Sequence, residues 1–333
     1  MNTAFTGLGV ALATPFSAPR VATAPAPGQR SGDGGSFERR TSRRRTSPPP
    51  VDLAAYRALI THVIAGGVDY LVVLGSTGEA ATVTDPERRE LIATALECAG
   101  SVPVVVGVGH QDTERTCDLA QMAHDAGAAG ILVVTPFYNK PQPSGIVAHF
   151  GQVAAAVPGM PIIAYTVPGR TGTNLDPATV ARLWTIPEVV AIKESSGDLR
   201  QISQLCLEAP QGRHVIAGDD DLAVPAIAVG ARGLISVCAN VAPAPTAELV
   251  HSALAGDFDR ARGTLAALAP LMAAMFAETN PVPVKAGLAS LGIGTAMVRA
   301  PLAPAAPDTW SHVQAALTGL RVARVPAGVG APW

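Results

Sequence analysis

One unit recurs along most of this sequence: a helical stretch that ends in glycine, a short apolar run, and a polar or glycine-rich turn. The glycines suit the left-handed position that stops a helix, and the apolar runs are typical of strands buried on both faces. Eight such runs alternate with helical stretches, which predicts a parallel sheet closed into a (β/α)8 TIM barrel. The predicted strands lie within residues 7–16, 70–74, 102–108, 131–134, 161–165, 189–193, 214–217 and 234–237.

The alternative to a barrel is a doubly wound open sheet, which would place a glycine-rich fingerprint after the first strand. The residues there are Ala13, Thr14, Pro15 and Phe16, which do not form one. Residues 242–320 contain no comparable apolar strand and are rich in alanine and leucine at helical spacing. We therefore expect them to form a C-terminal helical region packed on the barrel.

A segment of different composition interrupts the barrel pattern. Residues 18–50 hold proline, alanine, glycine, serine and five arginines between positions 39 and 45, with almost nothing apolar to bury. This composition predicts a disordered insertion. No aromatic residues interleave the arginines, so a solvated loop is favoured over a nucleic-acid-binding segment. The predicted division is a barrel (1–17 and 51–241) with this insertion, the helical region (242–320) and a tail (321–333).

Charge, cysteine content and hydropathy exclude several classes of protein. The formal net charge is −2, so the chain has no bulk attraction to nucleic acid or anionic membranes. Four separated cysteines form no C-x-x-C pair, which argues against a metal or disulfide framework and fits a reducing cytosol. No apolar run approaches the roughly 20 residues needed to span a bilayer. The N-terminus lacks the pattern of a signal peptide, so we expect a cytoplasmic protein.

A lysine stands at the carboxyl end of the sixth predicted strand, the end at which TIM barrels carry their chemistry. Lys193 follows the apolar run at residues 189–192. Desolvation favours the neutral amine over the ammonium, and a neutral amine can attack a carbonyl to form a Schiff base. The alternative is a lysine whose ammonium simply reaches solvent.

The other strand ends add hydroxyls, phenols and an arginine. Together with an amine, these groups suit carbanion chemistry on a 2-oxo acid, because an iminium is an electron sink and a tyrosine can move protons. Such chemistry requires no metal and no other cofactor. The residues at these ends are Ser76 and Thr77, Tyr138, Tyr165 and Arg170, and Gly218.

Three segments resemble those of a known superfamily. The turn at residues 75–79 (Gly-Ser-Thr-Gly-Glu), the segment 165–172 and Ile192-Lys193-Glu194 are similar to signature segments of the dihydrodipicolinate synthase and N-acetylneuraminate lyase superfamily. The resemblance covers nearly the whole chain except the insertion and the last dozen or so residues. It implies a class I aldolase on a (β/α)8 barrel with a C-terminal helical extension. Arg170 and Tyr138 point to the dihydrodipicolinate synthase branch.

The resemblance also implies roles for single residues. Lys193 would form the Schiff base with pyruvate, and Tyr165 would donate and accept protons. Ser76 and Tyr138 would relay protons with Tyr165, with Tyr138 reaching in from a neighbouring subunit. The implied protein is a homo-oligomer, either a dimer or a tetramer.

The remaining implied contacts concern the substrates. Thr77, Ile235 and Gly218 would contact pyruvate, and Arg170 would bind the carboxylate of L-aspartate 4-semialdehyde. One departure from the pattern is Thr166, which stands where the family usually has asparagine. Two alternatives remain at this stage: a related aldolase that cleaves N-acetylneuraminate or a 2-keto-3-deoxy sugar acid, and a scaffold protein that works through its arginine-rich insertion.

The resemblance extends to a regulatory site. Lysine-sensitive relatives bind lysine at a subunit interface. In an alignment by motifs, their histidines fall at Asp85 and Arg88, their asparagine at Gln111, their glutamate at Arg115 and their tyrosine at Phe137. Arg115 would put a positive charge where the effector's ammonium requires a negative one. We therefore expect weak inhibition by lysine, unless Arg115 turns to water or pairs with Asp112.

Overall fold

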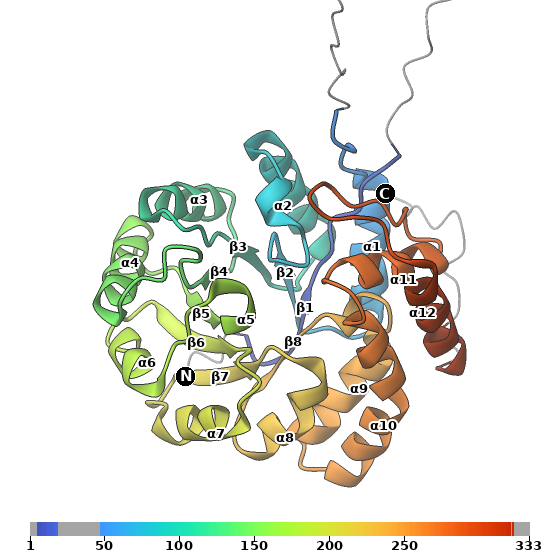
Figure 1. Ribbon diagram of the computed structural model, residues 1–333. Helices are drawn as coiled ribbons and strands as arrows, with labels where there is room; N and C mark the ends of the chain where they lie inside the picture. Colours follow the sequence, from blue (N-terminus) through green and yellow to red (C-terminus); the bar gives the residue numbers. More distant parts are fainter. Residues whose placement is uncertain (1–4, 19–46, 321, 323–333) are drawn as a thin grey trace, which may run out of the picture.

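The computed structural model describes residues 5–18, 47–320 and 322. At its centre, eight parallel strands form a closed barrel in which each strand pairs with its neighbour in sequence and β8 pairs with β1 (Figure 1). This confirms the predicted (β/α)8 barrel. The strands are β1 (Gly7–Ala11), β2 (Tyr70–Val73), β3 (Val104–Gly107), β4 (Gly130–Val134), β5 (Ile162–Thr166), β6 (Val189–Glu194), β7 (His214–Ala217) and β8 (Gly233–Ser236).

Some predicted strands are longer than the observed ones, because burial continues beyond the hydrogen-bonded ladder. β1 ends at Ala11, although Leu12, Ala13 and Phe16 are also fully buried. The Leu12 N–H still donates to the Val72 carbonyl, but at Ala13 a side chain replaces strand pairing, because the Ala13 N–H donates to Asn240 Oδ1 at 3.0 Å. Likewise β3 occupies only the middle of the predicted segment 102–108.

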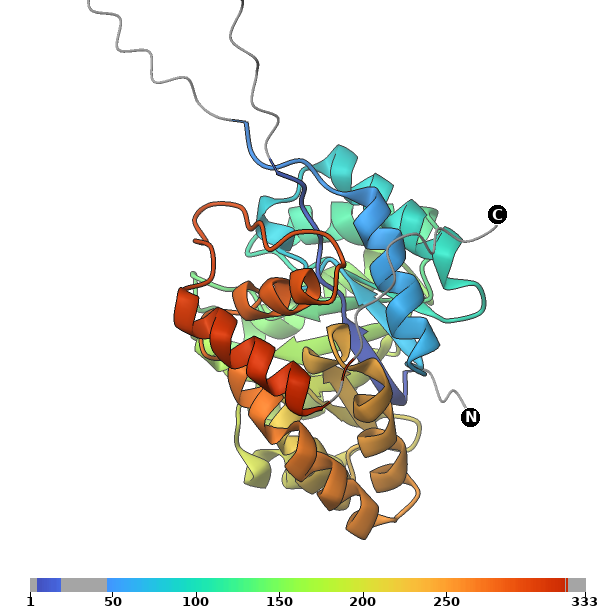
Figure 2. The ribbon, with the colours of Figure 1, turned by 90° about the vertical axis from the view of Figure 1, so that its right-hand side faces the viewer.

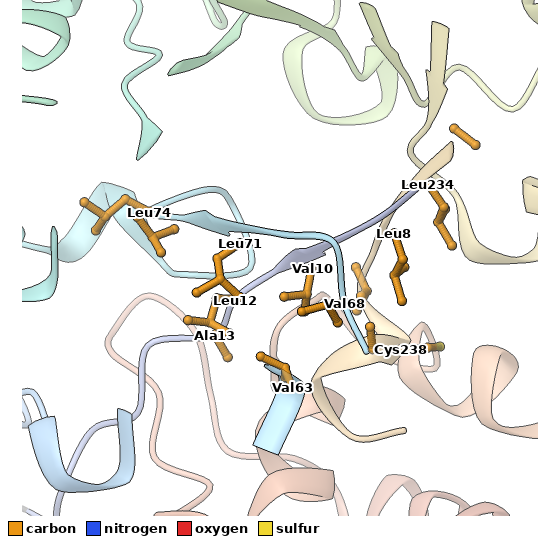
Figure 3. Packing of buried hydrophobic residues seen from close by; sticks show 14 of the residues in the cluster. Leu8, Val10, Leu12, Ala13, Val63, Val68, Leu71, Leu74, Leu234 and Cys238 are labelled. Atoms are coloured by element: carbon orange, nitrogen blue, oxygen red, sulfur yellow. The ribbon is translucent and has the colours of Figure 1, made fainter. Parts of the chain in front are cut away.

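Apolar side chains cover both faces of the strands, as expected for a parallel barrel. The side chains facing outward pack against the helices. Figure 3 shows Val10 of β1 and Leu71 of β2 on the side of the sheet on which Val63 of helix α1 (Leu53–Ala65) lies. A second, inner cluster fills the barrel; its members include Val72, Val105, Ile163, Ile216 and Ile235.

A ring of helices surrounds the barrel (Figure 1). Helix α9 lies against β1, β8 and α1 and so closes this ring, although it falls within the predicted C-terminal region. Helices α10, α11 and α12 pack together on one side of the barrel (Figure 2). The helices are α1 (Leu53–Ala65), α2 (Asp85–Ala99), α3 (Thr113–Asp125), α4 (Pro143–Ala156), α5 (Pro168–Thr171), α6 (Pro177–Leu183), α7 (Leu199–Glu208), α8 (Ala223–Ala228), α9 (Pro243–Leu254), α10 (Phe258–Met275), α11 (Val282–Ser290) and α12 (Pro307–Gly319).

The two sides of the predicted insertion meet at one point of the barrel. Phe16 and Val51 form an isolated antiparallel bridge, and the Ser17 N–H donates to the Pro50 carbonyl at 3.0 Å. Insertion residues 19–46, which include the cluster of five arginines at 39–45, and tail residues 321 and 323–333 lie outside the described residues. The predicted disorder and division into domains therefore stay predictions. No helix in the described part of the chain is long and apolar enough to cross a membrane.

Candidate active site

Lys193 lies beside a tyrosine at the carboxyl end of the barrel. It pairs in register with Tyr165 of β5, and its Nζ lies 4.3 Å from the centre of the tyrosine ring. Both side chains are nearly inaccessible to solvent. The chain has only two other lysines. Lys140 is exposed, and Lys285 is buried against Glu79. Lys193 is therefore the one lysine that can act at this end of the barrel.

A cavity of about 420 Å³ opens at Lys193. It adjoins a larger cavity, of about 630 Å³, that shares Ser76, Tyr165 and Arg170 with it. Six of the predicted site residues come together around the smaller cavity, although they belong to five segments: the turn after β2, β5, α5, β6 and the end of β7. These are Ser76, Thr77, Tyr165, Arg170, Lys193 and Gly218.

The turn after β2 presents two hydroxyls to this cavity. It is closed by backbone hydrogen bonds from the N–H groups of Gly78 and Glu79 to the carbonyls of Gly75 and Ser76. Leu74 and Glu79 flank it with positive φ angles of 58° and 50°, a conformation that bulky residues rarely adopt. Backbone strain of this kind needs support from the surrounding structure.

Gly218 is required by the crowding around Lys193. A Cβ atom at this position would lie 1.9 Å from Ser195 Oγ and 2.9 Å from Lys193 Cε, which is too close for either contact. Any larger residue would displace Ser195 or the lysine. Gly218 therefore contributes by leaving room for the lysine side chain as well as by lining the cavity.

The C-terminal segment before α11 joins two of these elements, a connection that the sequence analysis missed. Asn280 Nδ2 donates to Thr77 Oγ1 at 2.9 Å, and Arg170 Nη2 donates to the Asn280 carbonyl at 3.1 Å. Residues 277–285 also resemble the C-terminal stretch of that superfamily, but the resemblance does not single out Asn280. No pattern pointed to a contact with Thr77.

A buried ionic cluster supports the same turn from α11. Lys285 Nζ pairs with Glu79 Oε1, and both side chains are at most 2% exposed. The Arg299 N–H donates to the other Glu79 oxygen at 2.9 Å. Burial lowers the pKa of Lys285 to about 8, although the Glu79 carboxylate opposes that shift. The buried ion pair therefore links the turn that carries Ser76 to the C-terminal helices.

Two predicted site residues do not reach the cavity in this chain. Tyr138 is 87% exposed and has a φ of 69°. It does not line either cavity. Ile235 is fully buried in the inner cluster of the barrel with Tyr165 and also does not line the cavities. Their predicted roles remain predictions.

Thr166 has a local structural contact rather than one in the cavity. Its Oγ1 accepts from the Leu175 N–H at 3.0 Å and lies 3.3 Å from Asn174 Oδ1. The hydroxyl thus holds the loop that follows α5, the helix that carries Arg170. In the described residues, no group of three or more His, Cys, Asp or Glu side chains is placed to hold a metal ion.

Comparisons with known proteins agree on one group. The model of the dihydrodipicolinate synthetase family matches residues 48–320. The 4-hydroxy-tetrahydrodipicolinate synthase of Thermomicrobium roseum is 46% identical over 268 residues, which cover 80% of this chain and 88% of that protein.

Solved structures give the same result. The dihydrodipicolinate synthase of Thermotoga maritima has a TM-score of 0.84 and 35% identity, with 96% of this chain and 99% of that one covered. The chloride-inhibited enzyme of Acinetobacter baumannii, complexed with pyruvate, has a TM-score of 0.83 and 32% identity, with 95% and 99% covered.

Proposed function

The chain belongs to the dihydrodipicolinate synthetase family, and from this premise we propose that it condenses pyruvate with L-aspartate 4-semialdehyde to give 4-hydroxy-tetrahydrodipicolinate. This reaction is the entry step of diaminopimelate and lysine synthesis. The observation that carries the proposal is the contact of Lys193 with Tyr165 in a cavity that Arg170 also lines. Cytoplasmic localisation stays a prediction from the sequence.

Lys193 supplies the covalent step. Its amine attacks the C2 carbonyl of pyruvate, water leaves, and an iminium forms. The iminium withdraws electrons, so a methyl proton becomes acidic and Tyr165, beside the lysine, is placed to take it. The resulting enamine is a carbon nucleophile. The hydroxyls of Ser76 and Thr77 line the same cavity and can bind the pyruvate carboxylate.

Arg170 places the second substrate. The enamine carbon attacks the aldehyde of the semialdehyde, and the new alkoxide takes a proton from the site. Arg170 lies at the mouth of the cavity, where its guanidinium can pair with the substrate carboxylate. Attack of the substrate amino group on C2 then closes the six-membered ring and releases Lys193.

The direct test is an assay with pyruvate and each candidate aldehyde. We expect turnover with L-aspartate 4-semialdehyde and none with N-acetylmannosamine or a short sugar aldehyde. If the protein preferred a polyol aldehyde, the result would instead indicate an aldolase of the sugar-acid branch of the superfamily.

Replacing Arg170 by alanine should weaken use of the semialdehyde about tenfold or more, because a charge-assisted contact to a carboxylate contributes about 1.5–3 kcal/mol. Schiff-base formation with pyruvate should survive. Steady-state kinetics and borohydride trapping measure the two steps separately. Arg182→Ala, an exposed arginine on α6, is the matched control. Equal loss of both steps would make Arg170 a structural residue.

The conformation of Tyr138 supports the proposal of a homo-oligomer. A tyrosine that is exposed and has a positive φ is strained unless another surface holds it. We propose that it enters the cavity of a second copy. Mixing inactive Lys193→Ala and Tyr138→Phe proteins should then restore activity, because hybrid sites combine an intact Lys193 with an intact Tyr138. If the mixture of the two variants stayed inactive after their subunits had exchanged, this arrangement would be contradicted.

Lysine should inhibit this enzyme weakly. Arg115 lines the larger cavity and forms an ion pair with Asp85, rather than with Asp112. Arg88 also lies 4.0 Å from the same Asp85 oxygen. The carboxylate is thus already shared by two cations and cannot hold an ammonium well. The initial rate should stay constant as lysine is added to tens of millimolar. Half-inhibition below about 1 mM, which corresponds to about 4 kcal/mol of binding free energy, would contradict this.

A further inference from the structure

One carboxylate at the cavity has no role in the mechanism described above. Asp219 follows Gly218 at the end of β7 and lines the cavity together with Lys193 and Arg170. Among the described residues, the Ser195 hydroxyl alone approaches it as a donor, and that contact lowers its pKa. The rest of the hydrogen-bonding capacity of this carboxylate is available to a ligand.

The neighbouring carboxylates either accept hydrogen bonds already or lie outside the cavity. Asp220 is buried and accepts from the Ser236 hydroxyl and from the N–H groups of Val237 and Cys238. Glu194 Oε1 accepts from the Ser196 N–H and from Gln201, and Glu194 does not line the cavity, although its buried Oε2 has no partner. Glu278 lines the cavity but accepts from the Ala306 N–H, at the start of α12, at 2.9 Å. Asp219 is thus the carboxylate best placed to meet a cationic group of the substrate.

The second substrate of the proposed function brings such a group. L-aspartate 4-semialdehyde carries an ammonium next to the carboxylate that Arg170 binds. An ammonium has no lone pair, so it must lose a proton before it can attack C2 and close the ring. Arg170 and Asp219 line the same cavity with opposite charges, which matches the two charges of an amino acid.

We propose that Asp219 binds the ammonium group of the semialdehyde and removes the proton that this group must lose before ring closure. The carboxylate takes one proton, and the neutral amine attacks C2 of the iminium. The second amine proton moves to the Lys193 nitrogen, the bond from C2 to that nitrogen breaks, and Lys193 leaves as a free amine. The ring nitrogen keeps the positive charge until it loses its last proton. This inference rests on the proposed function.

The surroundings of Asp219 suit a base that works near neutral pH. Burial raises the pKa of Asp219 to about 6; the Lys193 ammonium opposes the rise, and Asp221 and Asp220 add to it. A base is most effective when its pKa lies near the working pH. The charged groups around it are Lys193 and Glu194 of β6, Asp220 and Asp221 of the following turn, and Arg170 and Glu278 across the cavity.

The test compares two aldehydes. 4-Oxobutanoate has the aldehyde and carboxylate of the natural substrate but no amino group. Asp219→Asn should lower kcat/KM for L-aspartate 4-semialdehyde by about 100-fold or more, a usual effect of losing a general base. The same variant should use 4-oxobutanoate, or be inhibited by it, as the wild type is. The acidic limb of the pH profile with the semialdehyde should also be absent in the variant.

Controls separate this role from general damage. Asp221→Asn removes an exposed carboxylate two residues away; it should keep both reactions and only move the acidic limb with the semialdehyde to lower pH, because Asp221 adds to the raised pKa of Asp219. Asp219→Glu should recover part of the activity. Borohydride trapping of pyruvate on Lys193 should proceed in all three variants. Equal loss with both aldehydes, or no loss with either, would overturn the proposal. A wild-type protein that does not turn over the semialdehyde would instead refute the proposed function itself.

Discussion

Replacing Lys193 by alanine should lower the rate of pyruvate consumption by several orders of magnitude, because the covalent intermediate can no longer form. Only two other lysines exist to take over the reaction. Lys140 lies outside both cavities, and Lys285 is buried in an ion pair with Glu79. After treatment with pyruvate and borohydride, the wild-type protein should carry one reduced adduct, on the peptide that contains Lys193.

Peptide mass spectrometry makes this test unambiguous, since three lysines are few enough to examine individually. The Lys140→Ala protein should keep both the adduct and the activity. An adduct on Lys140 or Lys285, or a Lys193→Ala protein that turns over pyruvate at a normal rate, would remove the Schiff-base mechanism.

Replacing Lys285 by methionine should lower the free energy of unfolding by about 3–5 kcal/mol, the usual cost of removing one member of a buried ion pair. The substitution keeps most of the side-chain volume but leaves the Glu79 carboxylate, which is 2% exposed, without its cation. It also removes the hydrogen bond from Lys285 Nζ to the Met297 carbonyl. Urea denaturation measures the change.

A double variant identifies the cause of this loss. Adding Glu79→Gln to Lys285→Met removes the uncompensated charge and should recover part of the stability. Lys140→Met, at an exposed site, should be neutral. If the Lys285→Met protein were as stable as the wild type, the pair would not contribute to holding the turn after β2.

The barrel and the position of Lys193 at its carboxyl end could be predicted from sequence because both depend on local patterns. A strand buried on both faces is a continuous apolar run, and its last residue is a single position in the chain. For this reason Lys193 was identified directly after 189–192, and it is the penultimate residue of β6. Strand ends were less predictable, since Leu12 and Ala13 are as apolar and as buried as the residues of β1 itself.

Contacts between distant residues could not be predicted in the same way. Asn280 and Thr77 are 203 residues apart, and neither residue type indicates the other. Asp219 and Asp220 are chemically identical neighbours, yet only one is saturated by buried donors. That difference depends on how β8 packs beside the end of β7, which a one-dimensional pattern does not contain.

The scarcity of lysine has a practical consequence for studying assembly. With Lys193 and Lys285 buried, an amine-reactive reagent has one accessible side-chain target among the lysines, Lys140. That residue stands two positions from Tyr138, the side chain expected to enter a second copy. The rate at which Lys140 is acylated therefore reports, without any engineered label, whether this face of the protein is free or covered at a given concentration.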